Sequence, residues 1–480
     1  MDVSQTIAIA LQHHQAGNLL QAEQLYRSIL EQEPEQVRAL HLLGVIAFQT
    51  HHPDDAIALY QQVIAIEPDY VWVYNDLGTA LRQQGDIETA IAAYQEAIAL
   101  QPDFVHAHYN LGNAFREQGD MAAAITAYQQ AIALNPEFTE AYYNLGGVLH
   151  DQGNLEEAIA CYHTILTFNP GYVNAHWNLA IASLLLGDLT TGLAEFEWRW
   201  QLPEQPPRAF KEPLWDGSFW QGQRLLLHAE QGFGDTIQFS RYVPLVAQRA
   251  AQQGGQVIVE CQPALMRLLA AMDGIDHLVP RDAPLPDFDV QAPLMSLPWL
   301  FGTTLDTIPA DIPYLTAPSS PLLQRSPQAR FHVGLVWAGN PERQSDGDRS
   351  CPLRYVQPIL DISGVAVYSL QKGEAAAELK HLGIESKLLD LSSQLHDFAD
   401  TAAIITQLDL VITVDTAVAH LAGALGHPVW VLLSHLPDWR WLLERNDSPW
   451  YPGMRLFRQP SPGDWQGVFE QVKEALQSVE

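Results

Sequence analysis

The sequence predicts a multidomain protein in which an all-α helical-repeat array is followed by an α/β region with two lobes. Its 480 residues are too many for one hydrophobic core. Up to about residue 200 prolines recur every 34 residues, and beyond residue 212 apolar runs alternate with helical patterns. Stacked helical repeats produce the first pattern, and parallel sheets whose strands alternate with helices produce the second.

The first 200 residues keep a constant register of five residue types. These are Pro34, Pro68, Pro102, Pro136 and Pro170; Gly44, Gly78, Gly112 and Gly146; Leu43, Leu77, Leu111, Leu145 and Leu179; Ala22, Ala56, Ala90, Ala124 and Ala158; and Tyr26, Tyr60, Tyr94, Tyr128 and Tyr162. Small residues let two helices approach, the ring fills the space between them, and the proline begins the next turn. The register predicts stacked helix hairpins, with five full units over 3–172 and a partial unit to about residue 200.

A polar residue stands one place before the register leucine in the later units. The row consists of Asp76, Asn110, Asn144 and Asn178, and Leu42 interrupts it in the first unit. In a stack of repeats these side chains line up on the concave surface, where an amide can both donate and accept hydrogen bonds. The row is a candidate site for an extended acceptor peptide, and the alternative is a solvated polar face.

Beyond the repeats, prolines cluster and the period is lost. We place the first domain at 1–200, a first lobe at 205–325 and a second lobe at 331–480, with a Pro/Ser-rich linker at 316–330. The expected strands are RLLLHAE, QVIVECQ, HLVPRD and DFDVQAPL, then FHVGLVWAG, VAVYSL, LDLVITV and PVWVLL. Ligands of parallel sheets bind at the carboxyl ends of the strands, so the expected site lies between the lobes.

Charge and composition exclude several classes of partner. The net charge is −31, and residues 1–200 hold 5 Lys and Arg against 24 Asp and Glu, which argues against nucleic acid. Salt screens charge beyond about 8 Å, so a local pocket can still bind a small anion. No apolar run has the roughly eighteen residues of a membrane helix, and the N-terminus lacks the basic region of a secretory signal. Cys161, Cys261 and Cys351 are odd in number and far apart, which indicates reduced thiols in a cytoplasmic protein.

The stretch LLLHAEQGFGDT places a glycine turn after the first expected strand of the α/β region. Gly232 and Gly234 allow close approach of the backbone, and Asp235 and Thr236 follow at the start of the next helix. The dinucleotide fingerprint is absent because Ile237 stands where its last glycine would be, and no GKS or GKT phosphate loop occurs. Asp235 is therefore a candidate general base that faces the interlobe cleft, and the alternative is a helix cap.

The stretch VITVDTAVAHLAGALG, residues 411–426, begins as a buried strand and continues as a helix of small residues. A helix that starts near Thr416 would direct its N–H groups and positive dipole end at the cleft, which is a ready anion site. Thr416 can donate its hydroxyl, Ala417 offers an unhindered amide, and His420 can donate from its ring. Asp415 accepts, so it suits a ribose hydroxyl. The alternative for His420 is a core histidine.

A diphosphate also requires local cations, because a helix dipole contributes only about 0.3–1 kcal/mol per charge. Two strand ends, GLVWAGNPERQSDGDRSCPL and YSLQKG, supply the candidates. They are Asn340, Arg343, Arg349, Ser350, Gln371 and Lys372. Arg349 is the strongest phosphate candidate because a guanidinium binds two oxygens at once. For Arg349 and Lys372 the alternative is a surface charge.

Other polar segments are expected to be structural. Asp287 with Asp289, and Asp346 with Asp348, have a DxD spacing, but the first is expected at a strand edge and the second in a polar turn, so we predict no metal site. Asp397 and Asp400 are expected to cap the helix before LDLVIT. The aromatic- and arginine-rich stretch PDWRWLLERNDSPWYPGMRLFRQ is expected to pack the lobes together, with stacking on a sugar or base as the alternative.

The repeats resemble tetratricopeptide repeats, and residues 205–480 resemble the two-lobed GT-B glycosyltransferase architecture with twin Rossmann-like lobes. The motifs that carry the second resemblance are GFGDT, GLVWAGNP, Arg349-Ser350, SLQKG, DFADTAA and VDTAVAHLAGALG. The second lobe is similar to that of heptosyltransferases, and the fusion is similar to bacterial relatives of protein O-GlcNAc transferases. The resemblance also implies that the last helix, near 464–478, crosses back towards the first lobe.

The resemblance implies an inverting, metal-independent enzyme without a cofactor, which moves a hexose or related sugar from a nucleotide sugar to a protein or peptide hydroxyl recruited by the repeats. It makes Asp235 the base and places Asp415, Thr416, Ala417 and His420 at the donor. After GNP similar proteins often carry a histidine and an asparagine, where this chain has Arg343 and Ser345. The alternatives are an inactive interaction scaffold and a transferase that acts on a saccharide or lipid.

Overall fold

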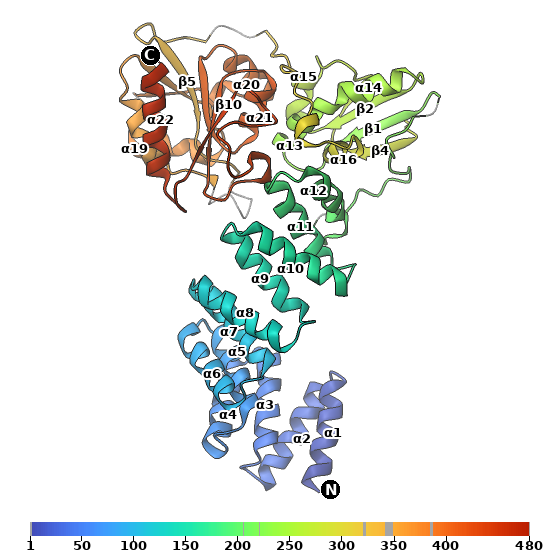
Figure 1. Ribbon diagram of the computed structural model, residues 1–480, viewed down its shortest axis with the longest axis vertical. Helices are drawn as coiled ribbons and strands as arrows, with labels where there is room; N and C mark the ends of the chain where they lie inside the picture. The colour runs from blue at the N-terminus through green and yellow to red at the C-terminus, as the bar shows by residue number, and fades with distance from the viewer. Residues whose placement is uncertain are drawn as a thin grey trace. The chain divides into compact units, whose positions relative to one another are not determined.

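The computed structural model describes residues 2–204, 206–219, 221–319, 323–340, 349–384 and 387–479 (Figure 1). The chain divides into two compact units, Met1–Leu179 and Ala180–Glu480. Within the described part of the chain, no helix has the length and apolar character needed to cross a membrane. The three cysteines are buried and form no disulfide.

The first unit is a run of paired helices. They are α1 Val3–Gln15, α2 Leu19–Gln32, α3 Val37–Gln49, α4 Pro53–Ile66, α5 Val71–Gln83, α6 Ile87–Leu100, α7 Val105–Gln118, α8 Met121–Leu134, α9 Thr139–Asp151 and α10 Leu155–Phe168. The next helix, α11 Val173–Leu185, contains the boundary between the two units, which follows Leu179. Each odd-numbered helix up to α9 packs on the even-numbered helix that follows, and successive pairs pack on one another. The predicted helix hairpins are therefore confirmed.

The register glycines and tyrosines explain the constant period. All five tyrosines are at most 1% exposed. A Cβ atom built on each register glycine would lie far inside van der Waals contact of a tyrosine ring carbon. These hypothetical distances are 2.5 Å for Gly44 to Tyr60, 2.7 Å for Gly78 to Tyr94, 2.6 Å for Gly112 to Tyr128 and 2.7 Å for Gly146 to Tyr162. Glycine is required here because the ring of the next helix occupies the space of a side chain.

The adjacent residues Gly146 and Gly147 provide a matched test of this packing. Both lie inside α9, but a Cβ on Gly147 meets nothing within 4 Å. We expect Gly146→Ala to destabilise the repeats by about 1–3 kcal/mol through overpacking against Tyr162. We expect Gly147→Ala to stabilise them by about 0.5–1 kcal/mol, since alanine is the better helix former. Thermal unfolding followed by circular dichroism measures both, and shifts of the same sign would contradict the packing argument.

The second unit begins with α12 Leu189–Phe196 and the 3-10 turn η1 Glu197–Gln201, and continues with a four-stranded parallel sheet. The strands are β1 Arg224–His228, β2 Gln256–Cys261, β3 His277–Pro280 and β4 Val290–Pro293, in the order β3-β2-β1-β4. The helices of this part are α13 Phe233–Phe239, α14 Val243–Ala251, α15 Met266–Leu269 and α16 Leu297–Leu300, with a 3-10 turn, η4, at Leu294–Ser296.

A second parallel sheet has six strands in the order β10-β9-β8-β5-β6-β7. They are β5 Phe331–Val336, β6 Val365–Ser369, β7 Leu388–Asp390, β8 Leu410–Val414, β9 Val429–Leu433 and β10 Met454–Arg458. The helices described here are α18 Gln357–Leu360, α19 Glu378–Leu382, α20 Phe398–Ile405, α21 Ala417–Ala424 and α22 Trp465–Val479. The 3-10 turns described here are η6 Leu353–Val356, η7 Glu374–Ala377, η8 Ser392–Gln394 and η9 Trp439–Trp441. The parallel α/β region is confirmed, and β7 and β10 are strands that the sequence reasoning missed.

The final helix packs differently from the expected crossing to the first lobe. Its buried residues Trp465, Phe469 and Val472 belong to the core under the second sheet. The segment before it makes the crossing instead: Arg241, which follows α13, donates a hydrogen bond of 2.8 Å to the carbonyl of Trp450. The aromatic and arginine-rich segment therefore packs the two sheets' layers together, as its composition predicted. The apolar face of α22 packs against the second sheet.

Candidate functional site

A cavity of about 840 Å³ lies in the second unit at the carboxyl ends of strands from both sheets. Its walls come from the residues that follow β1, β5, β6 and β8, which is where open parallel sheets bind ligands. Eleven of the residues singled out in the sequence line it: Gly232, Gly234, Asp235, Asn340, Arg349, Gln371, Lys372, Asp415, Thr416, Ala417 and His420. Thr236 and Ser350 are not among its lining residues.

Gly234 brings the two strand ends together. A Cβ on this residue would lie 2.9 Å from Cδ2 of His420 and 3.4 Å from Cα of Ala417, so only glycine allows α13 to approach α21 this closely. Thr236 is buried one turn further along α13 and donates to Oε1 of Gln262 at 3.0 Å. The glycine turn and the start of α21 thus face each other, and Thr236 fixes the turn from behind.

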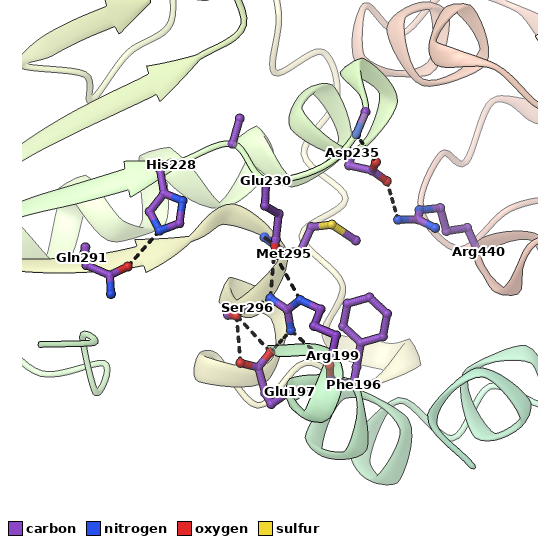
Figure 2. A network of polar contacts seen from close by, with 12 residues as sticks. Phe196, Glu197, Arg199, His228, Glu230, Asp235, Gln291, Met295, Ser296 and Arg440 are labelled. Atoms are coloured by element: carbon purple, nitrogen blue, oxygen red, sulfur yellow. Dashed lines mark hydrogen bonds and ion pairs between the residues drawn. The ribbon is translucent and has the colours of Figure 1, made fainter. Parts of the chain in front are cut away.

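Asp235 is held from two sides (Figure 2). Its Oδ2 accepts the amide hydrogen of Gly232 at 2.8 Å, which makes it the cap of α13. Its Oδ1 accepts from Arg440 at 2.6 Å. The structure therefore shows the helix-capping contact that the sequence analysis gave as the alternative for Asp235. The same carboxylate also lines the cavity.

Arg440 is the principal site residue that the sequence reasoning did not single out. It lies in η9, and its side chain is 7% exposed. Its guanidinium donates to Asp235, to Asp438 at 2.9 Å and to Gln238 at 2.6 Å. Burial disfavours its charge, but the carboxylates of Asp438 and Asp235 outweigh burial and raise the pKa of Arg440. The only sequence signal was an arginine between two tryptophans in a segment that packs the sheets together.

Asp415 directly follows β8 and is almost fully buried. Burial and the carboxylate of Asp438 raise the pKa of Asp415 to about 6, while Arg349 opposes the rise. Nη1 of Arg349 lies 3.8 Å from Oδ2 of Asp415. The two side chains form an ion pair, but this distance is too long for a hydrogen bond. With a pKa of about 6 the carboxyl is still mostly ionised near pH 7, so Asp415 remains a hydrogen-bond acceptor at the cavity.

Thr416 is the N-cap of α21, as expected for a helix that starts here. Its Oγ1 accepts from the amide of Val418 at 3.3 Å and lies 3.0 Å from Oγ1 of Thr413. Because the Thr413 hydroxyl donates to the carbonyl of Val414, the Thr416 hydroxyl donates to Thr413. The amides of Val418 and Ala419 are bonded to Thr416, which leaves the amide of Ala417 as the first-turn donor at the cavity lining that none of these bonds uses.

His420 is buried one turn into α21 and stacks on Trp441, with ring centroids 5.3 Å apart. Burial and the charge of Arg440 lower the pKa of His420 to about 3, so the ring is neutral near pH 7. Its Nδ1 is 3.0 Å from the hydroxyl of Tyr451. If Nδ1 accepts that hydrogen, Nε2 carries the ring proton and can donate into the cavity. The position of His420 is compatible with both predicted roles, a histidine of the core and a hydrogen-bond donor to a ligand.

The loops after β5 and β6 interlock. Gln371 accepts from the amides of Trp337 and Ala338 and donates to two carbonyls, so its amide holds the loops together. Lys372 donates to the carbonyl of Leu395. Ser350 accepts from the amide of Gly339 at 3.0 Å, which places Arg349 beside the end of β5. Arg343 and Ser345 lie outside the described residues.

The aspartates that the structure describes have the structural roles that the sequence predicted. Asp289 accepts from the backbone and side chain of Arg224 at a strand edge. Asp397 caps α20, and Asp397 and Asp400 both pair with Arg267 from the first sheet's layer. Residues 346–348 lie outside the described part of the chain. In the part that is described, no three His, Cys, Asp or Glu side chains are grouped as metal ligands.

The polar row of the repeats is half buried and bonded between repeats. Hydrogen bonds join His41 Nε2 to Asp76 Oδ2 at 2.8 Å, Asn110 Nδ2 to Asn75 Oδ1 at 2.9 Å, and Asn144 Nδ2 to Tyr109 Oη at 3.1 Å and to Asn113 Oδ1 at 2.8 Å. Asn178, the last member of the row, is also half buried. These bonds use part of each side chain's capacity, and an acceptor peptide would depend on the remaining groups.

A buried ion-pair network supports the glycine turn from below (Figure 2). Arg199, in η1, is 0% exposed and donates to both carboxylate oxygens of Glu230 at 3.1 Å. It also donates to Glu197 at 2.6 Å and to Ser296 at 2.8 Å. Glu230 stands two residues before Gly232, so the network connects the start of the second unit to the turn that carries Asp235. No sequence pattern indicated this network, because Arg199 lies 31 positions from Glu230 and 97 positions from Ser296.

Comparisons with known proteins agree with these two parts. Models of the tetratricopeptide repeat match residues 13–72, 75–137 and 115–184. The model of glycosyltransferase family 9 (heptosyltransferase) matches residues 362–434, which include the start of α21 and its flanking strands. The chain joins tetratricopeptide repeats to a glycosyltransferase family 9 segment. The match to this segment supports glycosyltransferase activity. The matched residues include neither Asp235 nor Arg440.

Several known proteins are similar to parts of this chain. Protein FlbA of Caulobacter vibrioides is 26% identical over 321 residues, which are 61% of this chain and 53% of FlbA, so the chain spans about half the length of that relative. A crystal structure of MamA is 28% identical, covers 33% of this chain and 93% of its own, and has a TM-score of 0.31. A structure of Pseudomonas aeruginosa pilF is 21% identical, covers 43% and 93%, and has a TM-score of 0.39.

Proposed function

We propose that the chain is an inverting, metal-independent glycosyltransferase of the two-lobed GT-B type, which moves a hexose or related sugar from a nucleotide sugar to an acceptor hydroxyl. One observation carries the proposal: the start of α21 and the glycine turn with Asp235 face each other across one cavity. The first offers amide donors and a positive dipole end to a diphosphate. The second offers a carboxylate to an acceptor hydroxyl.

In the proposed step the acceptor oxygen attacks the anomeric carbon on the face opposite the diphosphate. The new carbon–oxygen bond forms as the bond from that carbon to the phosphate oxygen breaks, so the configuration inverts. Asp235 takes the hydroxyl proton, and the nucleoside diphosphate leaves with the bonding electrons. The amides of α21, Arg349 and His420 stabilise the charge that develops on the leaving group.

The repeats are proposed to recruit a protein or peptide that presents the hydroxyl. The polar row formed by Asp76, Asn110, Asn144 and Asn178 keeps hydrogen-bonding groups beyond those used between repeats. Extended backbone is the matching ligand, because it alternates donors and acceptors along its length. Mass spectrometry of candidate acceptors after reaction distinguishes a modified protein from a modified saccharide or lipid.

A second candidate function is an interaction scaffold whose transferase part is inactive. The observation in its favour is that Asp235 is already occupied by the amide of Gly232 and by Arg440. A carboxylate used only for capping and for an ion pair would stabilise the structure without taking part in proton transfer. The two candidates differ in one measurable property, the binding of a nucleotide sugar.

The test is a panel of nucleotide sugars added to the full chain while its unfolding temperature is measured. We expect one donor to stabilise the second unit by about 2.7 kcal/mol at one hundred times its Kd. Thr416→Ala removes the N-cap that orders the first turn of α21, and His420→Ala removes a ring donor. Each should weaken that donor at least about 10-fold, the loss of about 1.4 kcal/mol of binding free energy. Thr167→Ala, on the exposed end of α10, is the matched control. A panel in which no donor stabilises the chain would support the scaffold.

A further inference from the structure

We propose that Tyr451 is a positioning residue that fixes the ring hydrogen of His420 on Nε2, so that this nitrogen donates a hydrogen bond to the diphosphate of the donor. The inference rests on the proposed function and deepens it, because it identifies the residue that makes His420 a donor. A neutral imidazole carries its hydrogen on either nitrogen, and the partner of one nitrogen decides the form of the other. In His420 that partner is the Tyr451 hydroxyl, 3.0 Å from Nδ1.

Three neighbours hold the ring of His420 in one orientation. Trp441 stacks on its face, with ring centroids 5.3 Å apart and planes 22° apart. Tyr451 lies at Nδ1. At the opposite edge, a Cβ on Gly234 would lie 2.9 Å from Cδ2 and 3.6 Å from Nε2. Nδ1 therefore faces the buried Tyr451, and Nε2 lies beside the glycine turn at the cavity that His420 lines.

The position of Tyr451 is fixed by its close approach to α21. A Cβ on Gly423 would lie 2.5 Å from Cδ1 of the Tyr451 ring, so glycine is required where the ring packs against the helix, three residues after His420. Tyr451 is 1% exposed. Burial raises the pKa of Tyr451 well above its usual range, so its hydroxyl keeps its hydrogen. The hydroxyl is thus held against Nδ1 in a form that can donate.

The bonds around the Tyr451 hydroxyl decide where its hydrogen goes. The hydroxyl of Tyr314 lies 3.4 Å away, which exceeds the usual range of a bond between hydroxyls. Tyr314 donates its own hydrogen to the carbonyl of Ile237 at 3.1 Å. The contact with Nδ1 of His420, at 3.0 Å, is the shorter one. The Tyr451 hydrogen therefore goes to His420, and Nδ1 is an acceptor.

The buried cation of Arg241 favours the same direction. Its guanidinium lies 4.6 Å from the centroid of the Tyr451 ring. A hydroxyl dipole turns its oxygen towards a nearby cation, which leaves the hydrogen for another partner. Burial and the charges of Arg440 and Arg241 lower the pKa of His420 to about 3, so the ring holds a single hydrogen near pH 7. Because Nδ1 accepts, that hydrogen lies on Nε2.

A donor at Nε2 complements the start of α21. The bonds to Thr416 leave the amide of Ala417 as the donor of the first turn at the cavity lining. A diphosphate there would receive one hydrogen from this amide and a second from Nε2 of His420. An Nε2 without hydrogen would present a lone pair to the phosphate oxygens and repel them. The position of one hydrogen therefore decides whether His420 attracts or repels the donor.

The first measurement locates the ring hydrogen in the full chain without ligand. Histidine with isotope-labelled ring nitrogens is incorporated, and a long-range proton–nitrogen correlation spectrum near pH 7 shows which nitrogen carries the hydrogen. The signals that vanish in His420→Ala belong to His420. We expect the hydrogen on Nε2 in the wild-type chain and a mixture of both forms in Tyr451→Phe.

Tyr242→Phe is the matched control. Tyr242 is 0% exposed, and its hydroxyl lies 2.8 Å from that of Thr303, so this variant also removes a buried hydroxyl from the second unit. It leaves the bond between Tyr451 and His420 in place. We expect its His420 ring to carry the hydrogen on Nε2, as in the wild-type chain.

The second measurement is calorimetric binding of nucleoside diphosphates to the full chain. The probes are uridine, guanosine, cytidine and adenosine diphosphate, and the tightest binder is used throughout. We expect Tyr451→Phe to weaken binding about 2- to 5-fold, because only rings with the hydrogen on Nε2 are competent. This effect should vanish in the His420→Ala background, since Tyr451 acts through His420. Tyr242→Phe should leave binding unchanged.

A hydrogen on Nε2 in the wild-type chain supports the inference and one on Nδ1 overturns it, so this spectrum decides the matter even if Tyr451→Phe does not fold. A single Nε2 form retained in Tyr451→Phe would also overturn it. So would a loss of binding by Tyr451→Phe that is equally large in the His420→Ala background, because Tyr451 would then act on the fold alone.

The outcomes separate this inference from the proposed function, because the ring hydrogen is located without ligand. A chain that shows the expected dependence on Tyr451 but binds none of the four diphosphates loses the proposed function and keeps the control of the ring by Tyr451. A chain that binds a diphosphate with the hydrogen on Nδ1 keeps the proposed function and loses the inference.

Discussion

Asp235→Asn is expected to lower turnover by about 10²- to 10⁴-fold, the usual worth of a general base. Asparagine has nearly the same shape, and its side-chain oxygen can still accept the amide hydrogen of Gly232. It cannot take a proton from an acceptor hydroxyl. The loss should therefore appear in the chemical step, measured in a single-turnover reaction with saturating donor, while donor binding is retained or improved.

Asp447→Asn serves as the control because Asp447 is paired with Arg445 on an exposed part of the same unit. Its turnover should equal that of the unaltered chain. Turnover by Asp235→Asn within about threefold of the control, roughly 0.6 kcal/mol, would remove Asp235 as the base. The capping and pairing of Asp235 would then describe its whole role.

Arg199→Met is expected to destabilise the second unit by about 3–5 kcal/mol, the cost of removing one partner of a buried ion pair. Arg199 is 0% exposed and bonds both oxygens of Glu230. Burial already raises the pKa of Glu230 even with Arg199 beside it, because the ionised carboxylate is poorly solvated. Without Arg199 the amide of Met295 still donates to Glu230 at 3.1 Å, but no cation of this network remains to offset the burial. Chemical denaturation of the full chain should report the loss.

The double variant Arg199→Met, Glu230→Leu is the informative control. It replaces the pair by apolar groups, and such replacements are often neutral relative to the intact pair. We therefore expect it to recover much of the stability that Arg199→Met loses. A loss below about 1 kcal/mol for Arg199→Met, in the range of an exposed pair, would show that the network contributes little.

The repeats could be predicted in detail because each position recurs. One glycine facing one tyrosine is weak evidence, but Gly44, Gly78, Gly112 and Gly146 in one register leave only one packing arrangement. The strands at the cavity were also predictable, since β1 and β8 are short apolar runs that end in glycine or polar residues. Their carboxyl ends had to meet at the edge of a parallel sheet.

Arg440 and Arg199 could not be predicted, for a shared physical reason. Each is a cation whose partners are distant in sequence: Arg440 pairs with Asp235 across 205 positions, and Arg199 pairs with Glu230 across 31. Hydrophobic period and turn chemistry report local structure, and an ion pair between distant residues leaves no local pattern. The final helix α22 illustrates the same limit, because its apolar stripe fits either sheet equally well in sequence.

The central claim is that the start of α21 binds the donor diphosphate opposite Asp235. The most direct measurement is a crystal structure of the full chain with a nucleoside diphosphate bound. We predict phosphate oxygens about 3 Å from the amide nitrogen of Ala417, in the cavity that Gly234 and Arg440 line. A diphosphate bound elsewhere on the second unit, with no phosphate oxygen near the first turn of α21, would contradict the claim.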